Sequence, residues 1–357
     1  MNYIVLDLEW NQCPAGKARE DKALPFEIIE IGAVRLDASH QITGQFREIV
    51  KPQVYTSLHF RTKEIVALRA MDFANARTFP EVANSFFDWC FHGEGADGAP
   101  EFCTWGSADL TELQRNLSYH AKKSASHNSP ESYDSVVNLS GESTQASSPS
   151  DKLYYHMESP FPFPLMYFDI QKIFSIVYED RKSRKSLEYA VDFLNIPKEI
   201  AFHSALSDAI YTSLVMQQLS EEQIRESSSV DYFRTPHTRK EEIFLHYKTY
   251  DKFVSKLFPS RNQAMKDAVV TSMRCPSCGK NVQRKIRWFS AGSHNQFCLA
   301  WCPQHGFVKG KIRLRQNPSG MTYAVKTTKL ISEEDARKIR ERKEVLRVKR
   351  RLHRHAQ

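Results

Sequence analysis

Four carboxylates have spacings that suit metal-dependent hydrolysis. Asp7 and Glu9 stand two residues apart in the apolar stretch YIVLDLEWNQ, and alternate residues of a strand share a face. Asp109 follows another short strand, and Asp208 lies in HSALSDAIYTSLV. Carboxylates crowded together repel each other unless cations lie between them. Such a set suits two divalent ions that activate a water and stabilise the leaving oxygen in phosphodiester cleavage.

Each acid also has a simpler explanation. Asp7 and Glu9 could belong to an exposed edge strand that never buries them. Asp109 could be an acid that is favoured near the N-terminus of a helix by the helix dipole.

A histidine and a tryptophan accompany the carboxylates. His203 lies five residues before Asp208, and five helical steps would separate the two side chains by about 140°. We therefore expect His203 in the loop before the helix, with Ser204 near the N-cap. A neutral imidazole there could take the proton from the attacking water; the alternative is a surface histidine. Trp10 could bind substrate by stacking on a terminal base, or fill core.

The last third of the chain carries a second set of metal ligands. CPSCGK (275–280) and CPQHG (302–306) each place two ligands in a tight turn, and two such turns make a tetrahedral zinc site. The predicted ligands of one structural Zn²⁺ are Cys275, Cys278, Cys302 and His305. Cys298 is a rival ligand, and buried free thiols are the alternative. The odd count of seven cysteines favours a reducing compartment over a disulfide framework.

Hydrophobic patterns predict the elements that position these residues. Alternation indicates strands at 3–9, 27–37, 45–52 and 101–105, whereas helical periodicity indicates helices at 62–70, 79–91, 107–117, 171–179, 186–194 and 206–219. This mixture predicts an α/β sheet flanked by helices.

Composition divides the chain into several parts. We expect a first α/β domain at 1–220, with a disordered Ser-rich insertion at 122–152 that has too few apolar residues to fold. A helical connector would span 221–265, and a small zinc-ribbon-like β domain would span 266–331. Residues 332–357 read as a basic helix capped by Ser332.

The ordered set of motifs resembles a known family. Asp7-x-Glu9, Asp109 and His203-x-Ala205-x-x-Asp208 resemble the DEDDh 3′–5′ exonucleases, over about residues 1–220. The stretches WGSADLTEL, IQKIFS and SLEYAVDFL are most similar to the branch with Eri-type exonucleases and bacterial homologues of the KinA-pathway sporulation inhibitor. The resemblance implies a ribonuclease-H-like fold, with a mixed five-stranded sheet flanked by helices.

The resemblance also implies roles for the residues. Asp7, Glu9 and Asp208 would hold one Mg²⁺ or Mn²⁺, while Asp7 would also hold a second ion that Asp109 reaches through water. His203 would be the general base. The substrate would be the 3′ end of single-stranded nucleic acid, with RNA favoured over DNA. The alternative is a non-catalytic nucleic-acid-binding or regulatory protein on an exonuclease scaffold.

Charge is spread unevenly along the chain. Residues 266–357 contain 22 Lys and Arg but 6 Asp and Glu, a net +16, whereas residues 1–265 carry −8. A basic part of this size favours a polyanionic partner, although a solvated basic surface is the alternative. RKIRWFSAGSHNQFCLAW and FVKGKIRLRQ mix basic and aromatic residues, as in surfaces that bind phosphates and stack bases; Trp288 and Phe297 could instead form a small core.

The sequence contains no run of about 18 apolar residues and no basic, apolar N-terminal leader. We therefore expect a cytoplasmic protein with no membrane partner. The oligomeric state stays open.

Overall fold

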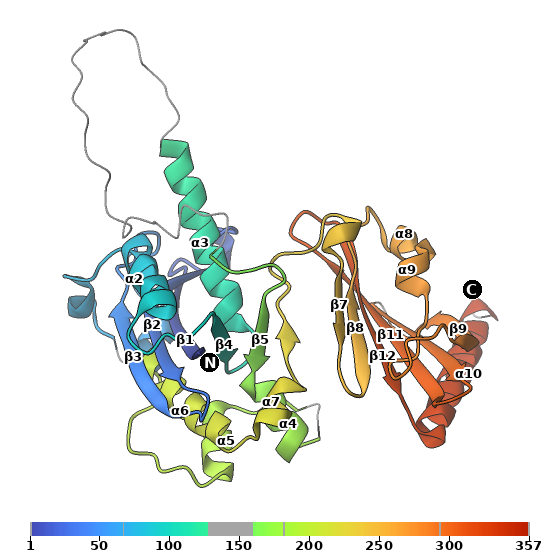
Figure 1. Cartoon of the computed structure of the whole chain (residues 1–357). Coiled ribbons are helices and arrows are strands. Elements are labelled where there is room, and N and C mark those ends of the chain that lie inside the picture. The colour runs from blue at the N-terminus through green and yellow to red at the C-terminus, as the bar shows by residue number, and fades with distance from the viewer. Residues whose placement is uncertain (1, 67, 128–159, 181–182, 293, 356–357) are drawn as a thin grey trace, which may run out of the picture. The chain divides into compact units, whose positions relative to one another are not determined.

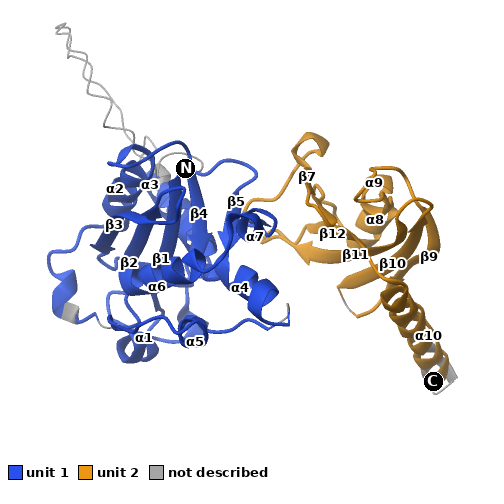
Figure 2. Cartoon of the chain, turned by 60° about the horizontal axis from the view of Figure 1, so that its bottom comes forward, with its two compact units in different colours: residues 1–233 blue, residues 234–357 orange. Residues whose placement is uncertain are grey.

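The computed structural model describes residues 2–66, 68–127, 160–180, 183–292 and 294–355 (Figure 1). The chain divides into two compact units, Met1–Phe233 and Arg234–Gln357, which have separate colours in Figure 2. This division falls inside the stretch 221–265 that we expected to be a separate connector.

The first unit is built on a mixed six-stranded sheet with the order β3-β2-β1-β4-β5-β6. The β1, β2 and β3 strands are antiparallel neighbours, β4 and β5 run parallel to β1, and β6 is antiparallel to β5. The strands are β1 (Asn2–Gln12), β2 (Phe26–Leu36), β3 (Ile42–Ile49), β4 (Pro100–Thr104), β5 (Met166–Asp169) and β6 (Ser229–Val230). The predicted mixed sheet is confirmed, but it has six strands rather than five, because the two-residue β6 pairs with β5 at the edge.

Helices cover both faces of this sheet (Figure 1). They are α1 (Phe60–Ile65), α2 (Phe79–His92), α3 (Ala108–His127), α4 (Ile170–Tyr178), α5 (Leu187–Phe193), α6 (Ala205–Gln217) and α7 (Glu221–Arg225), with short 3-10 turns at Lys17–Arg19 and Ala70–Phe73. The α2 and α3 helices pack on Ile4, Leu6 and Leu8 of β1, whereas α4, α5 and α6 pack on the side of Tyr3 and Val5. The alternation of β1 therefore assigns one face of the strand to each core.

The Ser-rich insertion begins later than expected. Residues 122–127 continue α3 rather than belonging to a disordered segment, since a helix with apolar residues packed at its start can extend beyond its last buried turn. The remainder of the predicted insertion, 128–152, lies outside the described residues.

The second unit has an antiparallel six-stranded sheet with the order β7-β8-β12-β11-β10-β9. Its strands are β7 (Ile243–His246), β8 (Tyr250–Val254), β9 (Gln283–Ser290), β10 (Asn295–Cys302), β11 (Gly306–Gln316) and β12 (Thr322–Leu330). Its helices are α8 (Arg261–Lys266), α9 (Ala268–Thr271) and α10 (Glu333–His355), with a 3-10 turn at Arg239–Glu241. The Ser332 hydroxyl accepts a hydrogen bond from the Asp335 amide and caps α10.

The helical connector predicted at 221–265 is wrong over most of its length. Residues 243–254 form the β7–β8 hairpin, and Val254 of β8 pairs with Val325 of β12. The β8 strand buries Phe253 in the core of the second unit, and this long-range packing decides between helix and strand for a short stretch. The sheet is consequently larger than the small ribbon that we expected.

Among the helices in the described ranges, none is both long and apolar enough to cross a membrane.

Candidate active site and metal centre

Asp7 and Glu9 share one face of β1, as their spacing predicts. In the adjacent β2 strand, Gly32 lies opposite Asp7 and Glu30 lies opposite Glu9. The alternate residues Leu6 and Leu8 are buried in the opposite core. A central strand, rather than an edge strand, therefore carries both carboxylates.

Helix α6 brings Asp208 to the same place. Ser204 is the N-cap of α6, and its hydroxyl accepts a hydrogen bond from the Ser207 amide, which places Asp208 in the first turn. The helix begins directly against β2, where a Cβ built on Gly32 would lie 2.1 Å from the carbonyl carbon of Ala205. The glycine permits this close approach, and ligand oxygens of Asp7, Glu9 and Asp208 lie within 4.8 Å of one another.

Asp109 enters from the other side of the sheet, in the first turn of α3. Its side chain is buried. Burial raises the pKa of Asp109 to about 7, although hydrogen bonds from its own amide and from that of Leu8 oppose the rise. Asp109 lies outside the compact group of three ligand atoms, but its charge raises the pKa of Asp7.

The four acids destabilise one another's charges. Burial, followed by the charges of Asp109, Asp208 and Glu9, holds the pKa of Asp7 well above its usual range. Burial together with Asp208 and Glu30 raises the pKa of Glu9 to about 8. A divalent cation between these oxygens would offset the repulsion. Several oxygen ligands around a small space are the donor set that Mg²⁺ and Mn²⁺ prefer.

His203 lies in the loop before α6, where the sequence places it. Its amide donates a hydrogen bond to Oδ1 of Asp208 over 3.3 Å, and its half-exposed imidazole has Nε2 3.5 Å from Oε1 of Glu188. The backbone of His203 has a φ of 69°, a conformation that few residues other than glycine adopt. Strained backbone of this kind is found at functional sites.

Trp10 packs against the first core rather than standing free. Its ring centroid lies 5.7 Å from that of Phe26, and the side chain is partly buried. A register shift in the β1–β2 pairing falls between Glu9 and Trp10. The core interpretation of Trp10 therefore has direct contacts in its support, and substrate stacking stays a prediction.

The structure adds one acid that we did not identify from the sequence. Glu30 is fully buried, receives a 2.6 Å ion pair from Nε of Arg47, and accepts a 3.4 Å hydrogen bond from the Ala205 amide. It links β2, β3 and the start of α6 beside the carboxylate cluster. The signal was an acid in the middle of the apolar stretch EIIEIGAV, where a charge needs a buried partner.

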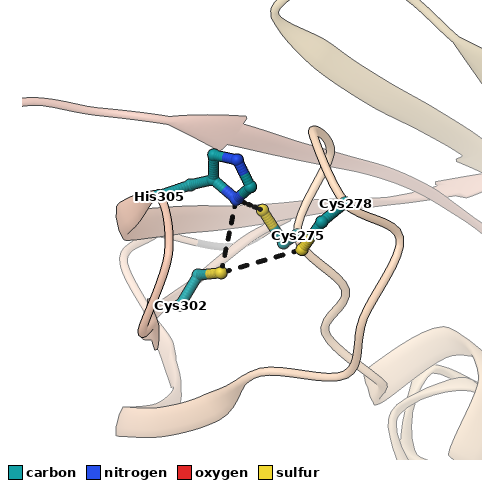
Figure 3. Close-up of side chains that lie close together, drawn as sticks. All are labelled: Cys275, Cys278, Cys302 and His305. Atoms are coloured by element: carbon teal, nitrogen blue, oxygen red, sulfur yellow. Dashed lines mark hydrogen bonds between the residues drawn. The ribbon is translucent and has the colours of Figure 1, made fainter.

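The second unit brings together the four predicted cysteine and histidine ligands (Figure 3). Sγ of Cys278 and Sγ of Cys302 are 3.8 Å apart, and Nδ1 of His305 lies 3.6 Å from Sγ of both Cys275 and Cys302. Sulfur ligands at about 2.3 Å and a nitrogen ligand at about 2.0 Å from one tetrahedral ion would be about 3.5–3.8 Å apart. The cluster therefore fits a tetrahedral metal ion.

The thiols of Cys302 and Cys298 differ in pKa, and therefore in how easily they form the thiolate that binds a metal. Burial opposes ionisation of Cys302, but hydrogen bonds from the His305 side chain and the Gln304 amide outweigh it, so that the pKa of Cys302 falls to about 6. Cys298 is buried outside the cluster, and burial raises its pKa to about 12. A metal binds thiolates rather than thiols, so Cys298 is unsuited to be the rival ligand.

Comparisons with known proteins give only distant likenesses. No protein-family model matches the chain, and no curated protein matches its sequence. A solved structure described as 3′-end specific recognition of a histone mRNA stem-loop by a 3′-exonuclease is 15% identical, with 64% of this chain and 85% of that chain covered and a TM-score of 0.45. The nuclease domain of 3′hExo, a DEDDh family member bound to rAMP, is 18% identical, with 65% and 96% covered and a TM-score of 0.44. Cell-death related nuclease 4 is 16% identical, with 64% and 65% covered and a TM-score of 0.43.

Proposed function

We propose that this chain is a metal-dependent 3′–5′ exonuclease that hydrolyses single-stranded nucleic acid. The observation that carries the proposal is the carboxylate cluster: ligand oxygens of Asp7, Glu9 and Asp208 lie within 4.8 Å of one another, with Asp109 close enough to perturb Asp7. Such crowding destabilises the folded chain unless cations join it. Several acids from distant segments meeting at one point are better explained by a metal site than by chance.

The roles of the residues follow from their positions. Asp7, Glu9 and Asp208 would hold one divalent ion, and Asp7 with Asp109 would serve a second. Two such ions, Mg²⁺ or Mn²⁺, supply an activated water and stabilise the leaving oxygen when bound. The imidazole of His203 would accept the proton of that water. Glu188, whose Oε1 lies 3.5 Å from Nε2, would orient the ring.

The finer parts of the proposal rest on the resemblance of the motifs. We favour RNA over DNA as substrate, removal of nucleotides from the 3′ end, a cytoplasmic location, and contact of Trp10 with the terminal base. We also assign one structural Zn²⁺ to Cys275, Cys278, Cys302 and His305, because their spacings suit its tetrahedral geometry.

The test is digestion of 5′-labelled and 3′-labelled single strands of RNA and DNA by the full chain, with Mg²⁺, with Mn²⁺ and without either ion. We expect 5′-labelled strands to shorten stepwise and 3′-labelled strands to release labelled mononucleotide, only with an ion. Asp7→Asn keeps the size of the side chain but removes its charge, and should abolish both reactions.

Asp88→Asn is the matched control, because Asp88 is an exposed carboxylate on α2 whose side chain pairs with the imidazole of His92 on the same helix. It should digest both labelled strands like the unaltered chain. Full activity of Asp7→Asn, or digestion without any divalent ion, would refute the two-metal site. Binding of strands without any digestion would favour the non-catalytic alternative.

A further inference from the structure

One face of the second sheet carries a row of cations along β11. Val308, Ile312 and Leu314 are buried in the cores of the unit. The residues between them point to the opposite face, since alternate side chains of a strand do so. That opposite face carries Lys309, Lys311, Arg313 and Arg315.

Neighbouring elements add further cations to this row. In β12, Lys329 lies opposite Lys309, and Arg342 of α10 reaches over the ring of Phe297 in β10. We call the set Lys309, Lys311, Arg313, Arg315, Lys329 and Arg342 the basic face.

Phe297 is the aromatic residue within the basic face, and its ring packs against the cations instead of being exposed for stacking. Phe297 is buried, and its ring centroid lies 5.5 Å from Nζ of Lys309, 5.8 Å from Nζ of Lys311 and 4.8 Å from the guanidinium of Arg342. Trp288 likewise packs in the core and donates a hydrogen bond to the Thr271 carbonyl. Neither of these two rings is exposed, so the structure does not favour the predicted stacking of bases on them. The basic side chains of β11 that were predicted to contact phosphates are present on the basic face.

Three cations of this row, Lys309, Lys311 and Arg313, follow one another along β11. Within the described residues, Lys309, Lys311 and Arg313 have no carboxylate oxygen within 4.0 Å, whereas on α10 Lys338 pairs with Glu334 and Arg337 with Glu341. Burial, then the charges of Arg313, Lys309 and Arg342, lowers the pKa of Lys311. Burial lowers the pKa of Lys309 as well, and Arg342 and Lys329 lower it further, although the charge of Asp335 opposes them. Lys309, Lys311 and Arg313 therefore repel one another, and a bound anion would stabilise them.

A groove continues the basic face at the end of β11. It is open to solvent and has a volume of about 550 Å³. Among the residues that line it are Lys311, Arg313 and Arg315 of the basic face, together with Arg261, His294 and Tyr323. A groove lined by cations suits an elongated anion rather than a compact neutral ligand.

We propose that the basic face and this groove bind the phosphate backbone of a single-stranded nucleic acid without regard to its sequence. Alternate residues of a strand are spaced by ~6.7 Å, which resembles the distance between successive phosphates of an extended strand. A linear row of cations fits a linear polyanion. The identification of the strand as the substrate, rather than a separate ligand, rests on the proposed exonuclease function.

The experiment measures binding of a 5′-fluorescein 20-nucleotide single-stranded RNA by full-length protein, without Mg²⁺ or Mn²⁺, over a range of KCl concentrations. Lys311→Ala with Arg313→Ala removes two charges from the row. We expect Kd to rise roughly tenfold at low salt, and the slope of log Kd against log salt to fall by about 1.4, or about 0.7 for each lost phosphate contact.

Arg337→Ala with Lys338→Ala is the matched control, because it removes the same charge from pairs that α10 already neutralises. It should leave both Kd and the slope nearly unchanged. Lys311 packs over Phe297, so Arg313→Glu provides a second variant at an exposed position. It should weaken binding even where the double variant is poorly folded.

Equal salt slopes for the unaltered chain, the double variant and Arg313→Glu would overturn the proposal. Equal losses in the α10 control would do the same, since they would show only an effect of net charge. Polyglutamate, or vesicles of phosphatidylserine and phosphatidylcholine, binding as tightly as RNA with the same dependence on Lys311 and Arg313 would assign the face to another partner.

Hydrolysis of a dinucleotide separates this proposal from the exonuclease proposal. A dinucleotide has too few phosphates to span the row, so its cleavage should be equal in the unaltered chain and in both double variants. Dinucleotide cleavage together with equal salt slopes in the unaltered chain and the variants would overturn the proposal for the basic face alone. Salt-dependent binding through Lys311 and Arg313 without any cleavage would overturn the exonuclease proposal alone.

Discussion

At the scale of single residues, His203 and Glu30 connect the carboxylates to their surroundings in different ways. His203 contacts Asp208 through its backbone amide, whereas its imidazole lies beside Glu188 and is the group that we propose as the general base. Glu30 is buried beside Glu9, forms an ion pair with Arg47 and accepts a hydrogen bond from the first residue of α6. These two interactions give Glu30 a positioning role. Substitution of each side chain therefore tests a different property, catalysis for His203 and assembly of the site for Glu30.

We predict that His203→Asn lowers kcat by about 10²–10⁴-fold, as for the loss of a general base. Asparagine tolerates the positive φ of this position and retains the amide that binds Asp208, so metal affinity should change little. Titration of Mn²⁺ and single-turnover rates measure the two effects. A parallel loss of metal affinity and rate would show that His203 holds the site together instead of transferring a proton.

We predict that Glu30→Gln weakens the start of α6 and lowers the stability of the first unit by about 1–3 kcal/mol, the range for a buried polar group that loses a partner. Arg47 is half-exposed, so water can solvate its unpaired charge and limit the loss. Denaturant unfolding measures the change. Arg47→Met in the Glu30→Gln background should add little if the two residues act as a pair.

At the scale of elements, the β2–α6 contact sets the geometry of the site. Asp7 and Glu9 are fixed by β1, but Asp208 depends on where α6 begins. The α6 helix begins against Gly32, which lies opposite Asp7 in the sheet. The distance between the strand and the helix therefore determines whether three ligand oxygens can share one ion.

We predict that Gly32→Ala reduces exonuclease activity by about 10²-fold, because a methyl group at 2.1 Å from the Ala205 backbone must displace α6 and a shift of about 1 Å has such an effect. Gly44→Ala is the control, since its added methyl would meet the Trp89 ring at an ordinary 3.6 Å. Activity assays beside thermal unfolding separate displacement from general destabilisation. Equal activity of the two variants would show that α6 does not need this close approach.

At the scale of the whole molecule, the two units have opposite charges. The second unit has 29 Lys and Arg against 9 Asp and Glu, a net +20, so the first unit has −12. The acidic unit suits divalent cations, and the basic unit suits phosphates. We therefore expect cleavage chemistry and strand binding to respond independently to substitutions.

We predict that Cys275→Ser with Cys278→Ser lowers the zinc content from about one ion per chain to none. Binding of a structural metal ion contributes to the folding free energy, so the second unit should lose stability and RNA affinity should fall, while dinucleotide cleavage persists. Cys298→Ala is the control and should retain zinc, because Cys298 lies outside the cluster. Zinc analysis of the purified variants measures this directly, and retention of the ion by the double Ser variant would contradict the assignment.

The metal-free chain should lose stability as pH rises from about 4.5 to about 8. The folded state raises the pKa of Glu9 from 4.5 to about 8, so in this window it binds more protons than the unfolded state, and the unfolding free energy falls as pH rises. The contribution of one such carboxyl is at most about 1.4 kcal/mol per pH unit. Relative to Glu9→Gln, the unaltered chain should therefore weaken with pH.

Added Mn²⁺ or Mg²⁺ should reverse this trend, since an ion that binds only the folded state stabilises it. Unfolding of both chains at several pH values, with and without the ion, measures the difference. A difference between the two chains that does not vary with pH would contradict the raised pKa of Glu9.

The sequence by itself determined the parts of this protein that depend on local spacing. Asp7 and Glu9 share a face because a strand repeats every two residues, His203 precedes α6 because Ser204 caps it, and the two Cys/His turns specify four ligands. Tertiary structure alone decided what depends on segments distant in sequence: Glu30 and Gly32 became part of the site through β1–β2–α6 packing, and residues 243–254 became strands by pairing with β12. Lys309, Lys311 and Arg342 meet at Phe297 for the same reason, because sheet register and the path of α10 bring together side chains of β11, β10 and α10.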